Sequence, residues 1–180
     1  LSSIGAADVI LNDVGSEAQS IYTLGESVPT EDQDNGATNP WGGQSNVAFN
    51  NDTYGSGTSQ ADADHAWTLT SDMLTYQSTG STNSQLNFGE SLDVGLSSNS
   101  QTTLKFSVSA GYDYAIELTM NQQGPGATSG SLKDSSGTVV LDWSYNDDGG
   151  IFSGMGSLAA GDYVLTMDTF SYYQQPVSFS

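Results

Sequence analysis

The sequence contains few residues of the types that carry out catalysis. It has no cysteine and a single histidine, His65, which follows Asp62 and Asp64. A serine–histidine–aspartate site requires a carboxylate that orients the histidine and a nucleophile within reach of its ring. No G-x-S-x-G sequence surrounds any of the serines. We therefore expect His65 to be a surface side chain in a polar turn.

Paired carboxylates are a second route to chemistry, since two of them hydrolyse glycosidic bonds when they lie about 5 Å or about 6.5–9.5 Å apart. The chain holds 21 aspartate and glutamate residues, most of them in turns rich in Gly, Asn and Ser. Glu117 and Asp142 lie within apolar segments, but each alternates onto the polar side. The sequence therefore predicts that the protein is not an enzyme.

Calcium is the one cofactor that the sequence suggests, because this ion binds about six to eight oxygen ligands. Segments 146–150 and 31–36 are dense in carboxylate and amide oxygens, and Asp147 and Asp148 are the predicted metal ligands. Neither segment has the acid spacing of an EF-hand loop. Both also suit ordinary Asx–Gly turns, so we expect that no cofactor is required.

Aromatic side chains suggest a carbohydrate site, because flat apolar rings with polar edges stack on sugars. Trp41 lies between Pro40 and two glycines in a segment that reads as a loop, and Tyr54 is its predicted partner. Trp67 and Trp143 alternate within apolar segments and are predicted to belong to the core. Trp41 and Tyr54 are therefore the candidate glycan-binding residues.

The composition excludes several classes of partner. With two lysines, no arginine and a formal charge of −19, the chain would repel nucleic acid phosphates. No apolar run approaches the roughly 20 residues that cross a bilayer, so membrane insertion is not expected. Scarce lysine, abundant Ser, Thr, Asn, Gln and Gly, and the strand-rich pattern together favour an extracellular or cell-surface location.

A period of two dominates the second half of the chain and predicts β-strands. Apolar residues alternate with polar ones in segments 102–109, 112–121, 139–145 and 163–167. Because each strand has one apolar face, a second layer must cover it. We predict an all-β protein, a two-sheet antiparallel β-sandwich of jelly-roll-like form, which spans 1–180 as a single domain.

The first hundred residues show a weaker pattern. Pro29, Pro40 and the Asn35-Gly36 pair break the segment from 25 to 43, which predicts a long loop. A second long loop is predicted over 50–60, rich in Gly and Ser, and a single helical turn over 60–66. These segments are expected to add strands and loops to the same sandwich.

Three segments resemble the hairpins of bacterial pre-peptidase C-terminal domains. They are the opening 104–118, the central S-L-K-D-S-S-G-T-V-V of 131–140, and the closing L-A-A-G-D-Y-V-L-T-M of 158–167. In these turns Asp134 can accept a hydrogen bond, Gly137 and Gly161 suit positive φ, and Tyr163 begins a buried strand. The resemblance covers 101–168 and implies an extracellular, non-catalytic β-sandwich, a type that sometimes binds calcium, protein fibres or glycans.

The two ends of the chain each carry a short apolar strand pattern, with Ala7, Val9 and Leu11 at the start and Val177 and Phe179 at the end. A terminal strand pairs within its own sheet or with the open edge of a neighbour, and the second choice produces open-ended polymers. We therefore expect a secreted structural subunit of a surface filament or matrix, with 1–11 as its exchange strand. The alternative is a carbohydrate- or calcium-binding module.

Overall fold

The computed structural model describes residues 8–24, 28–52, 55–70, 73–88, 94–120, 126–146 and 150–173. Within these ranges the chain forms strands and no helix, and hence no helix that could cross a membrane. The strands are β1 (Val9–Leu24), β2 (Thr30–Gly36), β3 (Trp41–Asn51), β4 (Gly55–Leu69), β5 (Leu74–Phe88), β6 (Val94–Val108), β7 (Tyr112–Met120), β8 (Gly126–Asp134), β9 (Val139–Asn146), β10 (Gly150–Leu158) and β11 (Gly161–Tyr173).

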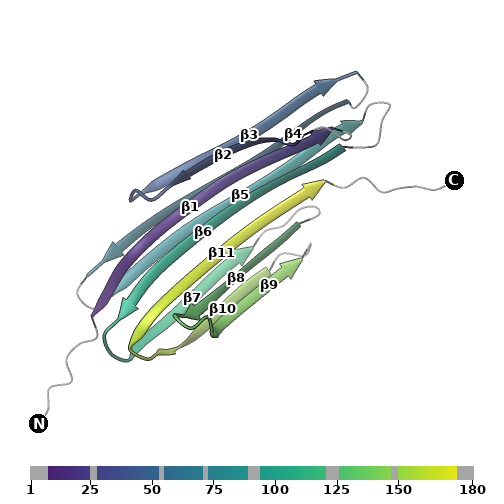
Figure 1. Cartoon of the computed structure of the whole chain (residues 1–180). Coiled ribbons are helices and arrows are strands. Elements are labelled where there is room, and N and C mark those ends of the chain that lie inside the picture. The colour runs from purple at the N-terminus through teal and green to yellow at the C-terminus, as the bar shows by residue number, and fades with distance from the viewer. Residues whose placement is uncertain are drawn as a thin grey trace, which may run out of the picture.

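The strands form two packed layers (Figure 1). One layer is a six-stranded sheet of order β2-β1-β6-β11-β8-β9, and the other contains the sheet β3-β4-β5 and the pair β10-β7. Every described strand pairing is antiparallel. The predicted all-β antiparallel sandwich is therefore confirmed.

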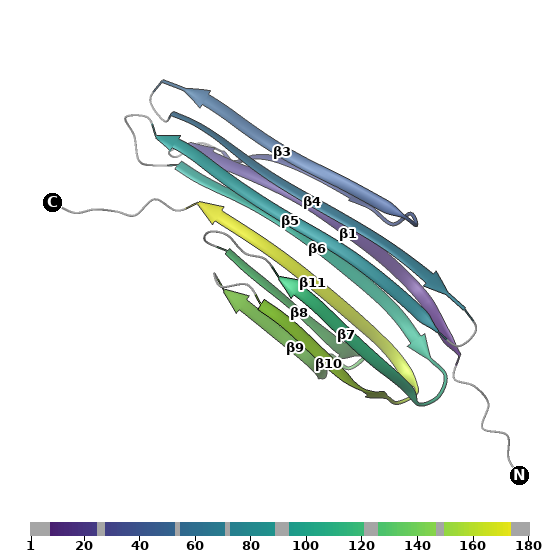
Figure 2. The ribbon, with the colours of Figure 1, turned by 180° about the vertical axis from the view of Figure 1, so that it is seen from behind.

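The strands run along one long axis, which gives the sandwich two distinct ends (Figure 2). Val9 and Gly161 both pair with Val108 at one end, which we name the Val108 end. Tyr173 pairs with Leu96 at the opposite end, which we name the Tyr173 end. The described chain thus begins at one end of the body and finishes at the other.

The N-terminal half contains more strand than its sequence predicted. Strands β2, β3 and β4 occupy most of the segments expected as loops over 25–43 and 50–60, and the helical turn expected over 60–66 is wrong. In β4 the buried positions are Gly57, Ser59, Ala61, Ala63 and His65, which alternate with more exposed residues. The period of two is present, but small residues carry it, so a search for large apolar residues misses it.

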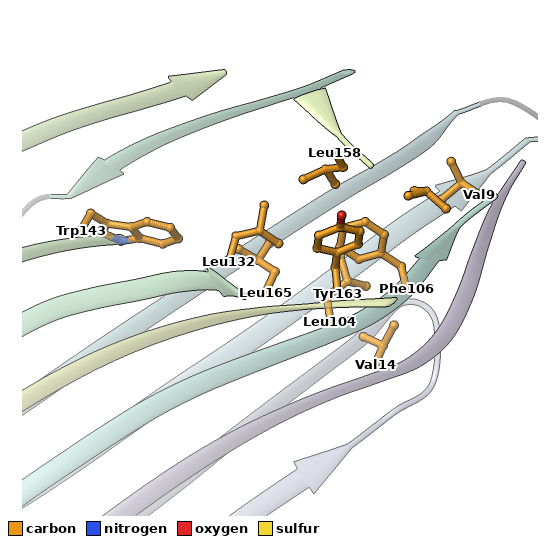
Figure 3. Close-up of a cluster of buried hydrophobic side chains, with 10 residues drawn as sticks. Val9, Val14, Leu104, Phe106, Leu132, Trp143, Leu158, Tyr163 and Leu165 are labelled. Atoms are coloured by element: carbon orange, nitrogen blue, oxygen red, sulfur yellow. The ribbon is translucent and has the colours of Figure 1, made fainter. Parts of the chain in front are cut away.

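One half of the interior is a conventional apolar core (Figure 3). Leu104 and Phe106 of β6 pack with Leu132 of β8 and with Tyr163 and Leu165 of β11. Trp143 belongs to the same cluster, as predicted.

The turn between β8 and β9 has the features that its sequence predicted. Asp134 accepts hydrogen bonds from the backbone N–H groups of Ser136 and Thr138, and Gly137 has a φ of 83°. The hydrogen bond from the Ser136 hydroxyl, together with those backbone bonds, lowers the pKa of Asp134.

The other half of the interior, between β1, β3, β4, β5 and β6, is lined by small and hydroxylated side chains. We call it the serine zone; its buried members are Ser16, Ala18, Ser20, Ser45, Ser59, Ala61, Ala63, His65, Ser98, Ser100 and Thr102. Hydrogen bonds connect the layers there: Ser20 Oγ lies 2.9 Å from Ser45 Oγ, and the Ser59 hydroxyl donates to the carbonyl oxygen of Ser97 at 2.7 Å. Small side chains bring the sheets close enough for these hydroxyl groups to meet.

Ala61→Leu tests how closely the layers approach in the serine zone. Ala61 is 0% exposed, so the extra atoms would force the sheets apart, and the free energy of unfolding should fall by about 1–3 kcal/mol. The matched control is Thr58→Leu, which adds an apolar side chain on the exposed face of the same strand. Urea denaturation measures both, and equal free energies for the two variants would contradict close packing.

Candidate functional site

The most distinctive surface feature is a groove between β5 and β7. These two strands lie at the edges of their sheets, since β5 pairs with β4 and β7 pairs with β10. A cavity of about 670 Å³ lies between them and is lined by Met73, by residues 74–79 of β5 and by residues 112–118 of β7. We call this cavity the β5–β7 groove. It separates the sheet β3-β4-β5 from the pair β10-β7 within the second layer.

The floor of the β5–β7 groove is the apolar core itself. Leu104, Leu132 and Leu165 of the opposite sheet reach it from below. Tyr114 and Ile116 contribute from the β7 wall, and their neighbours in sequence point outward to solvent. Burial also raises the pKa of Tyr76 on the β5 wall. The groove therefore has an apolar floor that lies between the edges of two strands.

The two walls run in the same direction. β5 and β7 both start at the Val108 end, where the Leu74 N–H donates a hydrogen bond of 3.3 Å to the Tyr112 hydroxyl. Further along β5, Ser78 reaches Thr102 and Ser84 approaches Ser98, so this strand runs toward the Tyr173 end. The arrowheads of β5 and β7 agree in both views (Figures 1 and 2). The second layer has five described strands, and one strand inserted between β5 and β7 would make six, as many as the first layer has.

His65 lies inside the serine zone, so its predicted place in a surface turn is wrong. Its Nε2 is 2.7 Å from the carbonyl oxygen of Thr38, which can only accept a hydrogen bond, so Nε2 is the donor. In the tautomer with its hydrogen on Nε2, Nδ1 accepts a hydrogen bond from the Ser16 hydroxyl at 2.8 Å. The Ser16 hydroxyl also lies 2.9 Å from the Thr102 hydroxyl. This serine–histidine pair resembles half of a catalytic triad, but both side chains are buried, 4% and 2% exposed, and a carbonyl oxygen replaces the orienting carboxylate. The geometry fits a structural network.

Trp41, a predicted glycan-binding residue, begins strand β3 and does not lie in a loop. Its ring is partly buried and stacks on His65, with ring centroids 5.8 Å apart. The indole also lies so close to Gly36 and Gly43 that a Cβ atom at either position would meet it at 2.0 Å or 2.2 Å. Trp41 thus helps to close the sandwich between β2 and β3. Tyr54 lies outside the described residues, and the glycan site stays a prediction.

The predicted metal ligands Asp147 and Asp148 also lie outside the described residues. The second acidic segment, 31–36, forms most of strand β2. There Asp32 accepts a hydrogen bond from the Asn46 N–H at 2.8 Å, and Asp34 accepts one from the Gln44 N–H at 3.2 Å. These carboxylates join β2 of one layer to β3 of the other. Among the described residues no group of three His, Asp or Glu side chains could hold a metal ion.

The predicted exchange strand is only partly described, since Ala7 lies outside the described residues. Val9 and Leu11 pair with Val108 and Phe106 of their own sheet. Val9 also lines the β5–β7 groove near the Val108 end. Residues 9–11 are therefore part of the sandwich, and their release would break pairing with β6.

The chain matches no known family model, no curated protein and no solved structure. The resemblance to pre-peptidase C-terminal domains therefore stays a prediction. The sequence predicted β7 within the strand segment 112–121, but it did not predict the groove. A strand's own alternation shows which face is buried, whereas its neighbours in the sheet depend on contacts distant in sequence.

Ser16→Ala tests the buried network around His65. Loss of the hydroxyl leaves His65 Nδ1 without its donor, so the free energy of unfolding should fall by about 1–3 kcal/mol. Ser144→Ala, on the exposed face of β9, is the matched control and should change it little. Chemical denaturation measures both variants; a Ser16→Ala protein as stable as the control would contradict a structural role for the network.

Asp168 of β11 gives a prediction about pH. Burial raises the pKa of Asp168 above the ordinary value of 3.8, so its charge costs stability in the folded state. This cost is present when the group is ionised and disappears as the pH falls through the raised pKa. Asp168→Asn should therefore raise the free energy of unfolding at about pH 7. This gain over the wild-type protein should shrink as the pH falls through the raised pKa of Asp168 toward the ordinary pKa of 3.8.

The matched control for Asp168→Asn is Asp142→Asn, on the exposed face of β9. This substitution changes the net charge of the protein by the same amount, but it removes an exposed carboxylate and not a buried one. Denaturation curves at a series of pH values compare the two. If both variants gain equally, general charge repulsion and not burial at Asp168 would explain the effect.

Proposed function

We propose that the protein is a secreted, non-enzymatic structural subunit that self-associates into a cell-surface filament or an extracellular matrix. The observation that carries this proposal is the β5–β7 groove. Two strand edges face each other across it above an apolar floor. An added strand would satisfy both edges with main-chain hydrogen bonds and cover the floor with alternate side chains.

Open strand edges favour assembly because each presents N–H and C=O groups to another chain. Soluble proteins commonly protect such edges with charged residues that point inward. In the β5–β7 groove the inward positions of the β7 wall are Tyr112, Tyr114, Ile116 and Leu118, while Asp113 and Glu117 point outward. Because Asp113 and Glu117 point out of the groove, no charge on the β7 wall opposes the entry of an apolar strand.

The amino-acid composition supports the extracellular location in this proposal. Two cationic side chains in 180 residues leave few cleavage sites for trypsin-like proteases, which is useful outside a cell. The absence of cysteine means that assembly needs no disulfide and no particular redox compartment. Buried Ser16 and His65 lie away from solvent, which argues against their use as a catalytic pair.

Ile116→Lys tests self-association through the groove. The substitution places a charge on the inner face of the β7 wall, so it should abolish assembly, whereas Ala115→Lys on the outer face of the same strand should leave it intact. Light scattering and electron microscopy of the purified protein over a range of concentrations measure the polymers. Circular dichroism confirms that each variant keeps its strands.

A wild-type protein that stays monomeric at the highest concentrations would overturn the proposal. Polymers that form equally well with Ile116→Lys would place the contact elsewhere on the surface and remove the groove as its basis. Loss of assembly with both substitutions would show that added positive charge, and not the groove, controls association.

A further inference from the structure

We infer that the β5–β7 groove receives the C-terminal segment, residues 174–180, of a second copy of this chain. This inference rests on the proposed function and names the partner of the same groove. The groove needs a strand with apolar side chains on one face, because its floor is apolar and its two edges supply backbone pairing. The sequence Q-Q-P-V-S-F-S places Val177 and Phe179 two positions apart, which directs both to the same face of a strand.

The position of Tyr173 brings this segment to a neighbouring groove. Tyr173 lies at the Tyr173 end, whereas Leu74 and Tyr112 mark the start of the groove at the Val108 end. When copies stack with these two ends in contact, a chain that continues beyond β11 enters the next groove directly. Because β11, β5 and β7 run in the same direction, the incoming strand would pair in parallel with both walls.

Charge also favours this occupant. The chain carries a net charge of −19, and Asp113 and Glu117 stand on the outer face of the β7 wall. A donor strand with acidic residues would meet repulsion at this rim. Segment 174–180 has no charged side chain, and its outward residues would be Ser178 and Ser180. Pro176, which lacks an N–H, falls before Val177 near the start of the paired stretch, a place where strands tolerate proline.

The N-terminal residues 1–7 are the competing donor and fit less well. Their large apolar residues, Leu1 and Ile4, lie three positions apart and would point to opposite faces of a strand. One of the two would face solvent while the other met the floor. Val177 and Phe179 lie two positions apart, so both would face the floor of the groove. Because a segment from the Tyr173 end that enters a groove at the Val108 end repeats without closing, the assembly is an open filament.

The test compares two full-length variants, Phe179→Asp and Ser178→Asp. Both add one negative charge to the same segment, but only the first places it on the apolar face. Phe179→Asp should raise the critical concentration for assembly at least about tenfold, since burial of a phenylalanine strengthens association by this order. Ser178→Asp should assemble at nearly the wild-type concentration. Addition of the synthetic peptide Q-Q-P-V-S-F-S to wild-type protein should shorten the filaments.

The outcomes separate this inference from the proposed function. If Phe179→Asp assembles like wild type while Ile116→Lys does not, the groove takes another segment and only the present inference fails. Removal of residues 1–7 would then identify the N-terminal donor. If wild-type protein is monomeric and Phe179→Asp lowers its melting temperature, the segment packs within its own chain and both proposals fail. A peptide that leaves filament length unchanged would also count against the C-terminal donor.

Discussion

The structure depends on the need to cover the buried face of the six-stranded sheet with a second layer. The second layer has five described strands, in two separate sheets, and the gap between them lies above Leu104, Leu132 and Leu165. Those three residues are buried, whereas Tyr114 and Ile116 of the groove wall are only partly buried. Apolar surface in contact with water costs roughly 25 cal/mol for each Å². The occupant that we propose for this gap between two strand edges is another strand.

The two halves of the interior solve the packing problem in different ways. Around Phe106, Trp143 and Tyr163 large side chains fill the space between layers, as in most sandwiches. In the serine zone the layers approach more closely, and hydroxyl groups such as those of Ser20 and Ser45 pair across the interface. Buried hydroxyl groups need partners to avoid a desolvation penalty, so these pairs also set the register of one sheet over the other.

The sequence predicted much of the C-terminal half because large apolar residues mark its strands. Leu104 and Phe106 of β6 and Tyr163 and Leu165 of β11 alternate as expected and are buried. In β4 the same period is carried by Ala61, Ala63 and neighbouring small residues, which a hydrophobic pattern does not report. The burial of His65 was also not predicted, because it depends on two partners distant in sequence, the Ser16 hydroxyl on β1 and the carbonyl oxygen of Thr38. The groove depends on which strands become neighbours, and local alternation contains no information about this.

The serine zone has a consequence for how the protein responds to temperature. Unfolding exposes apolar surface, which raises the heat capacity, and polar surface, which lowers it; in ordinary proteins the net change is about 12–15 cal/mol/K per residue. Here the exposed interior includes many hydroxyl groups, so the heat-capacity change per residue should lie below that range. A small heat-capacity change flattens the curve of stability against temperature. The free energy of unfolding of the sandwich would then change less between cold and warm surroundings, which suits the structural role that we propose.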